Sequence, residues 1–91
     1  MSEAADGVQG EYSEIADRQL DDLEERDPAL YDDVLTVCEA IFLAPGRAQS
    51  MSAAVQTEHG IIFRLAVPGR LPYKVFWTAS GPRIEAVFPF P

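Results

Sequence analysis

Four basic residues in the second half of the chain are the first whose type and spacing suggest chemistry: Arg64, Arg70, Lys74 and Arg83. Arg64 and Lys74 lie opposite in phase to the apolar residues of their expected strands, so both should project from the outer face of a sheet. Clustered cations bind phosphate, and they stabilise a phosphoryl transition state without a metal. The alternative is that all four are ordinary exposed charges at strand edges.

Glu58 and His59 are adjacent and form a possible acid/base pair. With Arg64 nearby, they would suit the attack of a ribose 2′-hydroxyl on a phosphodiester. Neighbouring residues on a strand point to opposite faces, however, so the two would share a site only if Gly60 marks a turn. The sequence favours an exposed loop at Glu58-His59-Gly60.

Two other reactive side chains fit better in a core. Cys38 is the only cysteine and is surrounded by apolar residues, as expected of a small buried residue. Trp77 would stack on bases if its face were open, but it shares the phase of Tyr73 and Val75, which favours packing. A lone cysteine forms no internal disulfide and suggests a reducing cytoplasm. One cysteine and one histidine are too few for a zinc site, and we expect no metal or cofactor.

Charge is distributed unevenly along the 91 residues, which carry a net charge of −8. Residues 1–33 hold twelve acids and two arginines, whereas residues 34–91 hold three acids and five bases. This balance argues against unaided binding to free DNA or to an anionic membrane. No apolar run of about 18 residues predicts a membrane span. The acidic N-terminus is unlike a signal peptide.

The first half predicts two helices. Residues 1–11 are expected to be a disordered acidic tail, with a possible short strand within 8–12. Ile15, Ala16, Gln19, Leu20 and Leu23 follow a helical period after a Ser13 cap. Asp27-Pro28 should end this helix and begin a second one, which stops at Ala44-Pro45-Gly46. The short connection predicts an antiparallel helical hairpin.

The second half predicts strands. A strand is plausible within 52–57, and residues 61–67, 73–79 and 83–88 alternate or are rich in β-forming residues. Turns at 68–72 and 80–82 would join them in an antiparallel meander. We therefore expect one α+β domain over residues 12–91, in which the helical hairpin covers one face of a small antiparallel sheet.

This order of elements resembles the RelE/ParE superfamily of bacterial toxins over about residues 12–88. The stretches that carry the likeness are DRQLDDLEERDPALYDDVLTVCEAIFLAP and FRLAVPGRLPYKVFWTASGPRIEAVF. The resemblance implies a two-layer α+β sandwich and a cognate antitoxin that wraps the toxin. It also implies either ribosome-dependent mRNA cleavage, as in RelE, or gyrase inhibition, as in ParE.

The resemblance assigns roles to some of the cations. Lys74 matches the strand cation that follows a tyrosine, and Arg64 matches a basic position one strand earlier, so both would act in catalysis. Arg70, in the turn between them, would contact phosphate. Arg83 matches no family position, but as a member of the same cluster of cations we expect it to contact RNA or phosphate. RelE-like enzymes also use an Arg, Tyr or His after the last strand, where this chain has Phe88-Pro89-Phe90-Pro91.

Two functions therefore stay open. The first is a RelE-like toxin, a metal-independent endonuclease acting on ribosome-bound mRNA. The second is a catalytically silent protein of the same fold, either a degenerate toxin that holds an antitoxin or a gyrase inhibitor. The cation pair favours the first, and the apolar segment after the last strand favours the second.

Overall fold

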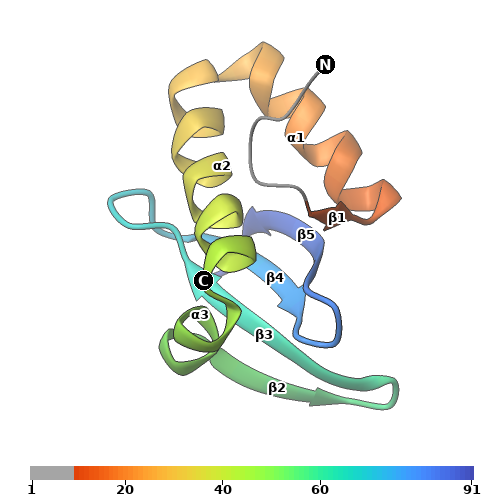
Figure 1. Cartoon of the computed structure of the whole chain (residues 1–91). Coiled ribbons are helices and arrows are strands. Elements are labelled where there is room, and N and C mark those ends of the chain that lie inside the picture. The colour runs from red at the N-terminus through yellow and green to blue at the C-terminus, as the bar shows by residue number, and fades with distance from the viewer. Residues whose placement is uncertain (1–9) are drawn as a thin grey trace.

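A computed structural model describes residues 10–91. It contains three helices and five strands in one α+β unit, with the helices on one face of the sheet (Figure 1). The strand order is β1-β5-β4-β3-β2. None of the helices in residues 10–91 is long and apolar enough to cross a bilayer.

The predicted helical hairpin is confirmed. Helix α1 spans Glu14–Arg26 and helix α2 spans Pro28–Leu43. The Ser13 hydroxyl accepts a hydrogen bond from the Ala16 amide, and the Asp27 carboxylate accepts one from the Leu30 amide. Both are N-caps, which satisfy amides that lack partners in the first helical turn.

The expected helical stripe is only partly correct. Ala16, Leu20 and Leu23 are buried, but Ile15 is 60% exposed. Gln19 lies at the edge of the stripe, where its side-chain oxygen accepts a hydrogen bond from the Val87 amide at 2.7 Å. The buried face of α1 is therefore narrower than the sequence pattern predicted: Ile15 lies outside it, and Gln19 makes a polar contact at its edge.

The segment after α2 contains a helix that the sequence did not predict. Helix α3 spans Pro45–Met51 and begins two residues after α2 ends at Leu43. Pro45 stops one helix and occupies the first turn of the next, because its fixed φ suits that position. Strand β2 then spans Ala53–Thr57, within the range where a strand was expected.

Four strands form the predicted meander. After β2 come β3 (Gly60–Ala66), β4 (Tyr73–Thr78) and β5 (Arg83–Pro89), each antiparallel to its neighbour. The expectation of a purely antiparallel sheet is wrong, because β1 (Glu11–Tyr12) pairs with β5 in parallel. The sheet is mixed. Residues 1–9 of the expected tail lie outside the described residues.

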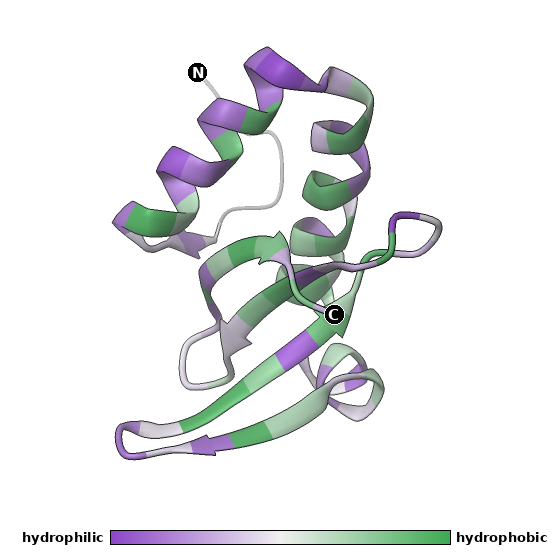
Figure 2. Cartoon of the chain, turned by 180° about the vertical axis from the view of Figure 1, so that it is seen from behind, coloured by the Kyte–Doolittle hydropathy of each residue, from purple (hydrophilic) through white to green (hydrophobic). Residues whose placement is uncertain are grey.

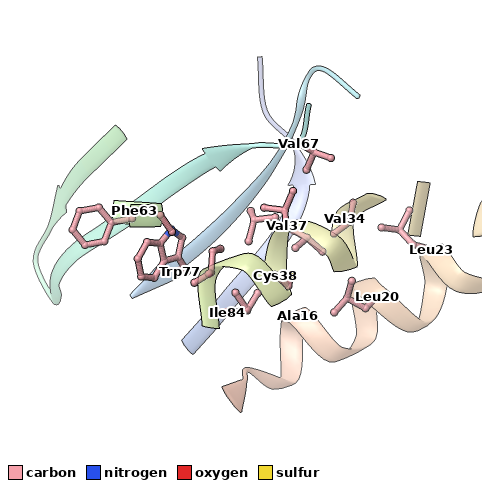
Figure 3. Close-up of a cluster of buried hydrophobic side chains, with 14 of the residues drawn as sticks. Ala16, Leu20, Leu23, Val34, Val37, Cys38, Phe63, Val67, Trp77 and Ile84 are labelled. Carbon is pink, nitrogen blue, oxygen red and sulfur yellow. The ribbon is translucent and has the colours of Figure 1, made fainter. Parts of the chain in front are cut away.

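The core lies between the helices and the inner face of the sheet (Figure 3). Trp77 is fully buried, packs against Phe63, and donates from its indole nitrogen to the Ser52 hydroxyl at 3.1 Å. Cys38 is also fully buried, and Tyr73 packs against the core. The packing interpretation of all three side chains is thus confirmed.

Candidate functional site on the outer sheet face

The outer face of the sheet, away from the helices, carries both of the cations expected there. Arg64 on β3 lies directly opposite Phe76 on β4, and Lys74 on β4 lies opposite Phe88 on β5. Directly opposite residues of antiparallel strands share a face. We call these four residues together with Phe90 the outer patch.

Arg64 and Lys74 are diagonal neighbours in this patch. Lys74 pairs with Ala66, two residues along β3 from Arg64, and such diagonal positions lie about 7–8 Å apart in antiparallel sheets. The sequence-based phase argument therefore placed both residues on one face, as neighbours across adjacent strands.

Phe90 lies between the two cations. The Arg64 guanidinium lies 5.1 Å from the centre of the Phe90 ring, a cation–π contact. The Lys74 ammonium donates to the Phe90 carbonyl at 2.8 Å and to the Pro72 carbonyl at 3.3 Å. A further bond from the Phe90 amide to the Pro72 carbonyl, at 2.8 Å, fixes this segment across the end of β4.

Three phenylalanines form the apolar part of the patch. The rings of Phe76 and Phe88 stack with centres 4.7 Å apart and planes within 10°, and Phe90 meets both edge-on. Phe90 is 39% exposed. The sequence analysis missed this cluster, although Phe76 has the same phase as Lys74, which is the signal that would have revealed it.

Arg64 and Lys74 have no carboxylate partner within residues 10–91. Each keeps hydrogen-bonding capacity. An ammonium has three donors, of which Lys74 uses two here, and a guanidinium that packs on a ring still presents its N–H groups at its edge. The patch can therefore accept an anionic group at two adjacent positions.

Arg70 and Arg83 do not join the two outer cations. Arg70 donates to the Asp33 carboxylate of α2 at 2.7 Å, and this hydrogen bond raises the pKa of the Arg70 guanidinium. The Arg83 guanidinium lies 3.5 Å from the Glu85 carboxylate, and its Nε atom is buried without a partner. The guanidinium of each arginine is thus paired with a carboxylate, so neither is free to bind phosphate as predicted.

Glu58 and His59 lie at the far end of the β2–β3 hairpin, in the turn between Thr57 and Gly60. Both side chains are exposed, with 3.9 Å between the histidine Nε2 atom and the carboxylate. Gly60, where β3 leaves this turn, lies four residues before Arg64, which corresponds to about 13 Å along a strand. The Glu58-His59 pair is therefore separated from the outer patch.

A concave surface lies on the helical side of the sheet. This groove, of about 590 Å³, runs between α2, α3 and β3. Its lining is mainly apolar and includes the exposed side chains of Leu43 and Met51. None of the five outer-patch residues lines it, so the groove and the outer patch are separate surfaces.

The acidic residues lie mainly on the helices. Within residues 10–33 there are ten acids and two arginines, which lie on β1, on α1, at the start of α2 and, for Asp27, between the two helices (Figure 2). The helices and the outer patch are on opposite sides of the sheet, so the negative charge of the helices and the positive charge of Arg64 and Lys74 face in different directions.

No protein-family model, curated protein or solved structure matches the chain.

Proposed function

We propose that this protein is a RelE-like toxin of the RelE/ParE type that acts on single-stranded RNA, and that the outer patch is its RNA-binding surface. The observation that carries the proposal is the placement of Arg64 and Lys74. They share one face of adjacent strands, and neither is neutralised by a carboxylate within residues 10–91.

Phosphate contacts would come from the two cations. Their backbone positions are diagonal neighbours about 7–8 Å apart, so both side chains can reach one short stretch of an extended strand, and both keep free donors. Because only two cations take part, binding to free RNA is expected to be weak. A ribosome that presents the mRNA would supply the rest of the docking energy.

Base contacts would come from Phe90. One side of its ring faces the Arg64 guanidinium, and Phe90 as a whole residue is 39% exposed. Bases stack on exposed aromatic rings with little sequence preference, and such a contact contributes about 1–3 kcal/mol. An exposed phenylalanine beside two cations is a suitable combination for single-stranded RNA.

Catalysis would depend on transition-state charge, with Lys74 and Arg64 as the electrostatic residues. Neither Glu58 nor His59 is near enough to transfer a proton there. This observation favours the second candidate, a catalytically silent protein of the same fold that holds an antitoxin or inhibits gyrase. A cognate antitoxin is the partner expected of either candidate.

Inducible expression in a bacterium separates the two candidates. The nuclease predicts growth arrest with mRNAs truncated at ribosomal A sites, and loss of both effects in the double variant R64A/K74A. Arrest with intact mRNA but broken chromosomal DNA would support the gyrase-inhibitor form of the second candidate. Normal growth of cells that contain the folded protein would reject the toxin proposal.

A further inference from the structure

The outer edge of β2 has the properties of a surface that pairs with another strand. Within residues 10–91, β2 is the last strand of the sheet, and its only neighbour is β3. Its residues Ala53–Gln56 are all exposed, and the β2–β3 hairpin extends away from the helices (Figures 1 and 2). Alternate backbone groups of an edge strand face outward without partners.

This edge lacks the usual protection against pairing. Edge strands are normally shielded by charged residues, proline, a bulge or a very short length. The sequence of β2 is Ala-Ala-Val-Gln-Thr, and its pairing with β3 has no register shift. The opposite edge is different, because in the described part of the chain β1 comprises two residues.

The sequence of β2 is also compatible with itself in antiparallel register. A two-fold axis at Val55 would pair Val55 with its own copy, Ala54 with Gln56, and Ala53 with Thr57. No charge would face a like charge, and all these side chains are small or uncharged. The register is therefore free of the repulsions that prevent edges from pairing.

The side-chain rows of the sheet would continue across such a pair. Val55 lies opposite Ile62 on the outer face, and Val55 is 37% exposed. Pairing about Val55 would create an unbroken row of four apolar side chains, Ile62 and Val55 from each copy. The same pairing would bury exposed apolar surface of both chains away from water, and this burial favours association.

We propose that two copies of this chain associate through an antiparallel β2–β2 pair centred on Val55, which joins two five-stranded sheets into one. A two-fold axis normal to the sheet would place both outer patches on the same face. A five-residue strand pair buries less than the roughly 1,200–2,000 Å² of a standard interface, so the dimer should be weak. The inference does not depend on the RNA proposal.

Sedimentation of the full chain tests the proposal. We expect a monomer–dimer equilibrium between about 10 μM and 1 mM, and loss of the dimer in Val55→Lys, which puts like charges opposite each other. Leu43→Lys is the matched control, because Leu43 is an exposed apolar residue on α2. A wild-type chain that stays monomeric over this concentration range, or a Val55→Lys variant that dimerises as much as the wild type, would overturn the proposal. The β2 edge would then be expected to pair with a strand of a different protein, if with any.

Cysteine crosslinking tests the register. Residues directly opposite each other lie about 4.5–5.5 Å apart between Cα atoms, within disulfide range, so Val55→Cys should crosslink under mild oxidation. Ala53→Cys should not, because the two copies of residue 53 would be about 13 Å apart. The native Cys38 is fully buried and should not react. Equal crosslinking of both variants would contradict the register, whatever the Val55→Lys variant does.

Discussion

Replacing Ser13 by alanine should destabilise the protein by more than its size suggests. The Ser13 hydroxyl accepts from the Ala16 amide at 3.0 Å and donates to the Glu85 carbonyl at 2.6 Å. It therefore caps α1 and at the same time ties that helix to β5. Ser13 is only 7% exposed, so water cannot easily replace either bond.

The magnitude follows from the two bonds. Loss of an N-cap costs about 1 kcal/mol, and a buried carbonyl left without its donor costs about a further 1 kcal/mol. The free energy of unfolding of Ser13→Ala should thus fall by about 2 kcal/mol. In urea, this corresponds to a midpoint lowered by about 1–2 M.

The control is Ser50→Ala. The Ser50 hydroxyl also donates to a backbone carbonyl, that of Arg47, but the contact is exposed. Its loss should change stability by less than about 0.5 kcal/mol. Equal midpoints for Ser13→Ala and Ser50→Ala would refute the reasoning.

Three further predictions concern stability. Burial raises the pKa of the Cys38 thiol from 9.0 to about 12. Between these pH values the thiol ionises in the unfolded chain but not in the folded protein, so the urea midpoint of unfolding should fall as the pH rises above 9. Double-mutant cycles on Asp33 and Arg70 should give a coupling energy below about 1 kcal/mol, because both side chains are partly exposed. Trp77→Phe, which loses the indole hydrogen bond to Ser52, should lower the free energy of unfolding by about 1–3 kcal/mol in urea titrations.

Local signals predicted most of the fold. The capping residues Ser13 and Asp27 predicted where the two helices begin, and the alternation of inward- and outward-facing side chains predicted β3. Helix α3 was missed because Pro45 was interpreted only as a stop, although proline also suits a first helical turn. The parallel pairing of β1 with β5 joins segments about 70 residues apart, and no local pattern specifies such a contact.

The site was predictable only where phase decides orientation. The alternation rule placed Arg64 and Lys74 on one face. It said nothing about Arg70, whose carboxylate partner is 37 residues away in the sequence. The position of Phe90 beside both cations also had no signal, because it depends on hydrogen bonds from Lys74 and to Pro72 rather than on a period.

The salt dependence of RNA binding tests the central claim most directly. Two phosphate contacts predict a slope of about −1.4 for the logarithm of the binding constant against the logarithm of salt concentration, and each of Arg64→Ala and Lys74→Ala should reduce its magnitude by about 0.7. Fluorescence anisotropy with a labelled single-stranded RNA measures these slopes. Arg47→Ala, which removes an exposed arginine from α3, should leave the slope unchanged. Slopes that are the same for the wild type and for the Arg64 and Lys74 variants would contradict the account.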